Sequence, residues 1–169
     1  MPPINFTTQL SKIGAFTILH LPKTASAKLP SRGMTLVEGT FNGKIFKTVL
    51  EPDGKGSHWF EVHTGKPGDT ATLSIATSKA WPEPEIPKDI LDALKSAPKS
   101  LATWKETTAM ARWDWIRWIR ATNSADTRKK RIGVALSKLK SGMRRPCCFN
   151  RAMCTKPAVS KGGVMLDAK

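Results

Sequence analysis

Tryptophans and arginines alternate over residues 109–120, and four consecutive cations, Arg128, Lys129, Lys130 and Arg131, follow after a short polar gap. Guanidinium groups bind carboxylates and phosphates through paired hydrogen bonds, and they also stack on aromatic rings. The chemistry that these residue types offer is therefore the binding of an anion, such as the backbone of a nucleic acid.

The first segment divides into two faces when about 100° is allowed for each residue of a helix. One wide face is apolar and is expected to pack in a core: Ala111, Trp115, Ile116, Trp118 and Ile119. The residues pointing away from it are Asp114, Arg117, Arg120 and Trp113. Arg112 projects into the middle of the apolar face, where a buried guanidinium needs a carboxylate, carbonyl oxygens or a bound anion.

The four later cations begin a second helical pattern. Its buried stripe is defined by Ile132, Leu136 and Leu139. Arg128 and Arg131 lie along the buried side of this predicted helix, whereas Lys129 and Lys130 face solvent. Unpaired cations in the first turns of a helix oppose its dipole by about 0.3 to 1 kcal/mol each. A negative group is therefore expected beside them.

Two interpretations of that negative group remain open. It can be a structural carboxylate, for which the candidates are Asp126, Asp114 and Glu106. It can also be a ligand, either phosphate or a nucleic-acid backbone. The candidate anion- or nucleic-acid-binding residues are Arg112, Trp113, Arg117, Arg120, Arg128, Lys129, Lys130, Arg131, Arg144 and Arg145.

The pattern of the remaining reactive residues predicts neither catalysis nor a bound metal. His20, His58 and His63 are scattered through the first half, without a serine, cysteine or aspartate at a recognisable spacing. Two glycine-rich stretches, residues 54–56 and 65–68, lack the order of a phosphate loop and are expected to be turns. We therefore expect no catalytic residue and no cofactor.

The three cysteines, Cys147, Cys148 and Cys154, all lie in the last quarter. An odd number and the absence of paired zinc-ligand spacing predict reduced thiols and no metal site. The first eleven residues are polar and strand-like, and no apolar run is long enough to span a bilayer. The expected location is the cytoplasm, without membrane insertion.

Charge is distributed unevenly along the chain. The 169 residues carry 28 Lys and Arg against 13 Asp and Glu, a net charge of +15, and the isoelectric point is near 10.1. Residues 1–85 hold 9 basic and 7 acidic side chains, while residues 86–169 hold 19 and 6. This asymmetry suggests two modules, of which the second is strongly basic.

Strand-like patterns fill the first half, at residues 5–10, 15–21, 34–41, 44–50, 58–62 and 70–77. Asn42 and Gly43 predict a two-residue hairpin turn, because both tolerate positive φ. Three prolines within residues 82–87 then exclude both ladder and helix. The sequence predicts an α+β protein, with a small antiparallel β-barrel followed by a helical domain of three to four helices.

The helical half has clear boundaries. Pro87 suits a helix start, Pro98 ends that helix, and a second helical stretch runs over about residues 101–121 with an interruption near 107–108. Asn123 or Ser124 can cap a third, which Gly142 can end. The predicted organisation is residues 1–80 as barrel, 81–87 as Pro-rich connector, 88–145 as basic helical domain and 146–169 as a loose tail.

Residues 37–46 (VEGTFNGKIF) and 50–58 (LEPDGKGSH) resemble the DUF1905 domain, a small bacterial β-barrel of unknown function. That family is similar to the double-split β-barrel proteins, a group that includes DNA-binding dimers. The second half is similar to the YdeI/OmpD-associated (OmdA-like) bacteriocin-protection family, through residues 86–87, 118–121, 127–128, 131–132 and 139–145. The resemblance implies a protective role at the bacterial envelope and brings no catalytic residues.

The sequence favours a non-enzymatic bacterial protein, monomer or homodimer, that binds an anionic partner, most suitably nucleic acid, through its basic helices. One alternative is a protein-interaction or stress- and bacteriocin-protection module without nucleic-acid binding, whose charge serves solubility. A second alternative is an enzyme with a site between barrel and helices.

Overall fold

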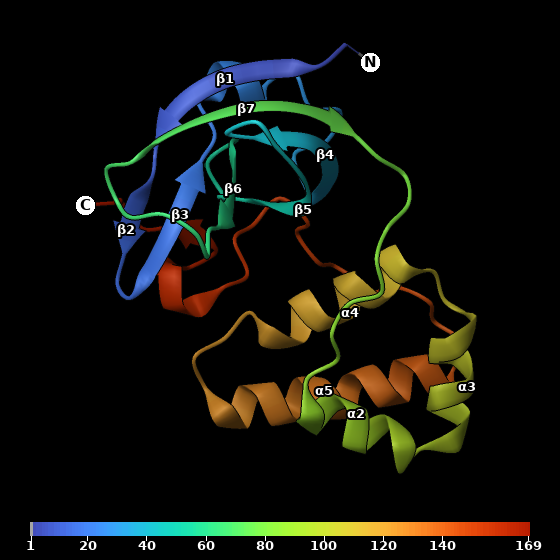
Figure 1. The fold of residues 1–169 in the computed structure, drawn as a ribbon. Helices are drawn as coiled ribbons and strands as arrows, with labels where there is room; N and C mark the ends of the chain where they lie inside the picture. Colours follow the sequence, from blue (N-terminus) through green and yellow to red (C-terminus); the bar gives the residue numbers. More distant parts are fainter. Residues whose placement is uncertain (1) are drawn as a thin grey trace. The chain divides into compact units, whose positions relative to one another are not determined.

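The computed structural model describes residues 2–169, which divide into two compact units (Figure 1). The sheet unit contains the chain up to Ala80 together with Arg151–Cys154 and Ala158–Lys169. The helical unit contains Trp81–Asn150 and Thr155–Pro157. The Pro-rich connector thus groups with the helices.

Seven antiparallel strands form the sheet, in the order β1-β7-β4-β5-β6-β3-β2. The strands are β1 (Ile4–Gln9), β2 (Ser11–Ile13), β3 (Phe16–His20), β4 (Thr35–Phe41), β5 (Lys44–Pro52), β6 (His58–Glu61) and β7 (Thr70–Thr77). The six predicted strands are all present, and β2 is an addition. A short helix, α1 (Lys23–Ser26), follows β3.

The sheet must curl, because its two edge strands are neighbours in sequence. Only Leu10 separates β1 from β2, although they stand at opposite ends of the strand order. The result is a barrel-like curled sheet, which confirms the predicted fold class. The Asn42–Gly43 turn has φ values of 48° and 80°, as the hairpin prediction requires.

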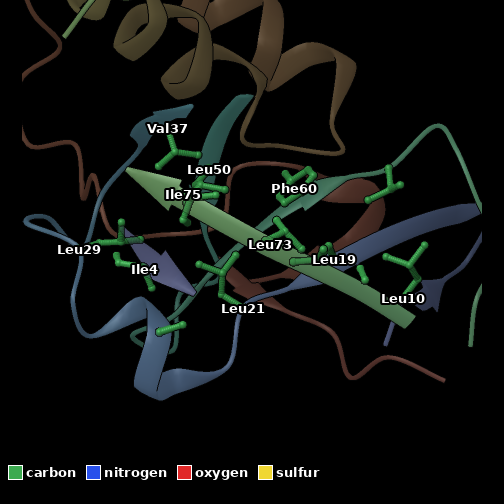
Figure 2. Close-up of a cluster of buried hydrophobic side chains, with 13 residues drawn as sticks. Ile4, Leu10, Leu19, Leu21, Leu29, Val37, Leu50, Phe60, Leu73 and Ile75 are labelled. Atoms are coloured by element: carbon green, nitrogen blue, oxygen red, sulfur yellow. The ribbon is translucent and has the colours of Figure 1, made fainter. Parts of the chain in front are cut away.

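The interior of the curl is filled by aliphatic side chains that alternate along the strands (Figure 2). Among the most deeply buried are Leu19, Val37, Leu50, Leu73 and Ile75. Each such side chain contributes about 1.5 to 3 kcal/mol relative to full exposure. This core fixes the positions of the loops at its rim.

The prediction that residues 146–169 form a loose tail is wrong for residues 157–165. Residues 157–165 form a 3-10 turn (Pro157–Val159) and a small hairpin of β8 (Ser160–Lys161) and β9 (Val164–Met165). Val159 and Met165 are buried against Trp59 in a second core cluster of the sheet unit. The sequence has too few periodic residues here to show this, because the apolar contacts come from strands far away in the chain.

Four substantial helices build the other unit: α2 (Lys88–Lys95), α3 (Pro98–Glu106), α4 (Ala109–Arg120) and α5 (Ala125–Lys140). Thr108 and Ser124 cap α4 and α5 by accepting hydrogen bonds from backbone amides. The predicted interruption near residues 107–108 and the cap at Ser124 are therefore confirmed. The core contains Ile90, Leu94, Trp104, Trp115, Ile116, Ile119, Ala135 and Leu139.

Candidate anion-binding site

The first two candidates, Arg112 and Trp113 of α4, hold the Pro-rich connector. The Arg112 guanidinium forms a two-point ion pair with the Glu83 carboxylate, and it also donates to the Thr107 carbonyl oxygen at the end of α3. The Trp113 indole nitrogen donates to the Pro82 carbonyl oxygen at 2.9 Å. Arg112 thus finds the carboxylate and carbonyl partners that its position on the apolar face requires.

Arg128 is also occupied by a carboxylate. Its Nε and Nη2 atoms lie 2.7 and 3.0 Å from the two oxygens of Asp89, at the start of α2. The expected structural carboxylate is therefore present, but it is Asp89 and none of the three predicted candidates. The hydrogen bond with Arg128 lowers the pKa of Asp89 and raises that of Arg128.

Arg131 satisfies its charge with carbonyl oxygens. Its Nη1 atom donates to Trp118 and Ala121, at 3.1 and 3.0 Å, where α4 ends. Its guanidinium carbon lies 5.7 Å from the centre of the Trp118 ring. The carbonyl end of a helix carries partial negative charge, so Arg131 caps α4 electrostatically.

The side of α4 that was predicted to point away from the core is partly buried. Asp114 is 2% exposed and Arg117 is 0% exposed. The Arg117 guanidinium lies over the Phe149 ring, 5.2 Å from its centre, and Arg145 lies 3.6 Å from the Asp114 carboxylate. Arg120 donates from Nε and Nη2 to the Thr155 hydroxyl, at 3.2 and 3.1 Å. The outward orientation of Asp114 and Arg117 was a wrong prediction, since a later segment packs there.

The last two arginines make looser contacts. Arg144 donates to the Glu106 carbonyl oxygen at 3.0 Å, and its guanidinium lies 3.4 Å from the carboxylate of the same residue. Arg145 lies 3.6 Å from the Asp114 carboxylate. All the arginines among the candidates therefore have partners within the helical unit.

The lysines behave differently. Lys129 and Lys130 are exposed on α5, as their helical angles predict, and neither forms an ion pair within residues 2–169. Five further exposed lysines of the helical unit share this property: Lys95, Lys99, Lys105, Lys138 and Lys140. Lys99 and Lys140 line a shallow hollow of about 350 Å³ with Ala97, Pro98 and Ser100. The cations available to a partner are thus lysines.

A buried polar cluster in the sheet unit was missed by sequence reasoning. The Ser26 hydroxyl lies 2.7 Å from His58 Nδ1, and His58 Nε2 donates to the Gly33 carbonyl oxygen at 2.8 Å. Arg32 donates to the Ser26 hydroxyl at 3.2 Å, which leaves that hydroxyl to donate to His58. Ser26 and His58 are both 0% exposed, so this serine–histidine pair lies in the interior of the sheet unit.

Asp53 anchors the other side of this region, at the β5–β6 turn. One carboxylate oxygen lies 2.8 Å from His20 Nε2, and the other accepts hydrogen bonds from the amides of Lys55 and Ser57. Burial raises the pKa of Asp53, but these hydrogen bonds outweigh it and hold the pKa below 3.8. Burial lowers the pKa of His58 below 6.5. The glycine-rich stretch at residues 54–56 is therefore a turn ordered by a carboxylate.

An aromatic groove lies on the sheet unit. The rings of Phe41, Phe46 and Phe60 lie 5.9 to 6.4 Å apart and line a hollow of about 270 Å³. Lys44 and His63 also line it. Neighbouring Ile45 is 92% exposed, which is unusual for a large apolar side chain. This region can accept an apolar group.

These features define a class: a curled-sheet and helix protein with buried polar clusters and a lysine-rich surface. Residues 6–65 match the family model described as a domain of unknown function (DUF1905). Residues 83–142 match the model described as bacteriocin-protection, YdeI or OmpD-associated (OmdA). The two matches follow each other along the chain in the order that the resemblance predicted. No curated protein matched the chain.

Within residues 2–169, no helix is long and apolar enough to cross a bilayer. The same residues contain no group of three or more His, Cys, Asp or Glu side chains placed to hold a metal ion.

Proposed function

We propose that the protein is a non-enzymatic module that binds a polyanion, with nucleic acid as the most suitable partner, through the solvent-facing lysines of its helical unit. The observation that supports this proposal is a division of the cations into two groups. The arginines of the unit contact protein groups, while Lys129, Lys130 and five other lysines remain exposed to solvent.

This division determines the kind of recognition. The planar guanidinium of arginine binds the O6 and N7 atoms of guanine through two hydrogen bonds, and here the arginines are engaged elsewhere. Lysine ammonium groups act as point charges on phosphates and release counterions. The helical unit carries 16 Lys and Arg against 7 Asp and Glu, a net charge of +9. We therefore propose binding that depends strongly on salt and weakly on sequence.

A salt titration tests this proposal. Binding of a labelled DNA duplex is measured by fluorescence anisotropy between about 50 and about 200 mM salt, where phosphate contacts lose affinity steeply. The test variant changes Lys129, Lys130, Lys138 and Lys140 to Gln. The control removes four exposed cations from the sheet unit: Lys23, Lys28, Lys66 and Lys161. The helical variant should lose affinity and salt slope, while the control keeps most of both. Equal losses, or no binding by the parent protein, would contradict the proposal.

The aromatic groove favours a second candidate function, the recognition of an apolar segment of a protein. Phe41, Phe46 and Phe60 offer ring faces and edges to such a segment. The fluorescence of an uncharged apolar dye, Nile red, reports binding to the groove. Phe46→Ala should abolish dye binding, and Val164→Ala, at another exposed apolar position, should leave it unchanged. Dye binding that survives Phe46→Ala would remove this candidate.

A further inference from the structure

Two thiols lie side by side on the surface of the helical unit. Cys147 and Cys148 are both exposed, and their Sγ atoms are 3.1 Å apart. Adjacent side chains diverge by about 100° in a helix and point to opposite faces of a strand. Here Cys148 has a φ of 59°, in the left-handed region that non-glycine residues rarely adopt. This backbone conformation accompanies the close approach of the two sulfurs.

The segment that carries the pair is tied down on both sides. Before it, the Trp115 indole donates to the Arg144 carbonyl oxygen at 3.0 Å, and Pro146 is buried. After it, the Phe149 ring packs on the Arg117 guanidinium. A ligand that needs both sulfurs would therefore meet a prearranged pair and would lose little binding energy in ordering the loop.

The two thiols also influence each other electrically. The hydrogen bond with Cys147 raises the pKa of Cys148, while the charge of Lys138 acts in the opposite direction. This hydrogen bond is a second sign that the two sulfurs lie together.

The distance between the sulfurs restricts the ligand. With bonds of about 2.3 Å, the length of a zinc–thiolate bond, a separation of 3.1 Å corresponds to an angle of about 85° at a shared atom. This is narrower than the tetrahedral angle that zinc prefers. It is close to the bond angles of pyramidal trivalent arsenic and antimony. Within residues 2–169 no third metal-ligating side chain completes the set, and such a centre needs none, because it keeps a substituent of its own.

We propose that Cys147 and Cys148 form a two-thiol site for a trivalent thiophilic metalloid. With an organic arsenoxide as the ligand, two arsenic–sulfur bonds form and the arsenic–oxygen unit is lost. The two thiol protons leave with that oxygen as water. No electrons are transferred, so the step requires no oxidant or reductant. The site adjoins the proposed polyanion surface at Lys138, but the arsenic–sulfur chemistry does not depend on that surface.

The test uses the full chain, reduced with a phosphine, and phenylarsine oxide as the probe. Native mass spectrometry should show one phenylarsenic group per chain, and thiol titration should show that two thiols are lost. A dithiol reagent should release the group, whereas a monothiol at the same thiol concentration should not. Joining two sulfurs in one site raises affinity by about 100-fold or more. Cys147→Ser and Cys148→Ser should each weaken binding by about that factor.

Cys154→Ser is the matched control, because Cys154 is buried in the sheet unit. It should bind phenylarsine oxide as the parent does. The proposal would be overturned if no adduct forms, or if Cys147→Ser and Cys148→Ser bind phenylarsine oxide as tightly as the parent. Loss of binding by a folded Cys154→Ser variant would overturn it as well. Both test positions are exposed, and circular dichroism of the two variants should match that of the parent.

Discussion

The two units bury polar groups in different ways. In the sheet unit, Asp53, His58 and Ser26 are enclosed near the β5–β6 turn and α1, and each is held by short hydrogen bonds. In the helical unit, arginines connect one element to another, as Arg128 joins α5 to Asp89 at the start of α2. The sheet unit therefore contains groups that titrate between neutral and acidic pH, while the helical unit relies on permanently charged guanidinium groups.

Basic residues have two different roles in the helical unit: the arginines connect structural elements, and the lysines carry charge at the surface. A guanidinium provides several donors in a fixed plane, so one arginine can bind a carboxylate and helix-end carbonyls together. Arg112 does this at Glu83 and Thr107. An ammonium on a flexible stem gains less from such a position, and the lysines are left at the surface. A charge count alone does not distinguish these two uses.

The largest change in stability is expected from removal of the C-terminal segment. This deletion should destabilise the sheet unit and leave the helical unit unaffected. Ending the chain after Pro157 removes Val159 and Met165 from the cluster around Trp59. Two buried apolar side chains correspond to about 4 kcal/mol. Amide hydrogen exchange of β6 peptides, measured at increasing urea concentration, should report this loss of stability. The exchange rates of α5 peptides should change little. Leu166→Ala, at an exposed position, is the control. Unchanged β6 protection would mean that this segment adds nothing.

Arg112→Ala should be the most damaging substitution at an arginine of the helical unit. It leaves carbonyl oxygens at the end of α3 unsatisfied and frees the connector at Glu83. Because Glu83 is 67% exposed, water replaces part of the ion pair, and a loss of about 2 kcal/mol is expected. Urea unfolding measures it, and limited proteolysis should show faster cleavage within residues 81–87. Arg144→Ala, whose side chain is 60% exposed, should cost less than about 1 kcal/mol.

Acidification should distinguish the units by the pH at which each weakens. The folded pKa of His58 lies below 6.5, so the unfolded chain binds the extra proton first as the pH falls. The free energy of unfolding of the sheet unit should therefore decrease below pH 6.5, by at most about 1.4 kcal/mol per pH unit for one group. Asp53, with its pKa below 3.8, adds a second loss below that pH.

The helical unit should respond later. Hydrogen bonds with Arg112 and Arg128 lower the pKa values of Glu83 and Asp89 from 4.5 and 3.8, so its stability should decline only as the pH falls below about 4.5. Protection of the amides of β6 and α5 peptides from hydrogen exchange, measured between about pH 7 and about pH 4, compares the stability of the two units. His63→Gln, at an exposed position, should leave the response of β6 in place. If both units lose protection together above about pH 5, His58 is not the group that weakens the sheet unit first.

The smallest expected effect compares neighbours on α5. Arg128→Ala removes the contact with Asp89 and should cost about 1 kcal/mol, because both side chains are partly exposed. Lys129→Ala should change stability by less than about 0.5 kcal/mol. A double-mutant cycle with Asp89→Ala isolates the pair energy. If Arg128→Ala is as harmless as Lys129→Ala, the ion pair does not stabilise the unit.

Local patterns determined most of the elements. Alternation and turn residues predicted six strands and the Asn42–Gly43 hairpin, and prolines with capping residues predicted the helix boundaries, including the break before Thr108. These features depend on backbone geometry over a few residues, which sequence records directly. The need of Arg112 and Arg128 for partner groups was also predicted.

The identity of those partners was decided by the tertiary structure. Asp89 is 39 residues from Arg128, and Glu83 is 29 residues from Arg112. No local periodicity relates such positions, because their proximity depends on how helices pack. The same reason explains the buried Ser26–His58 pair and the ordered hairpin at residues 160–165. By itself, the sequence determined the charge and most of the secondary structure; the long-range packing decided which charges remain exposed to a partner.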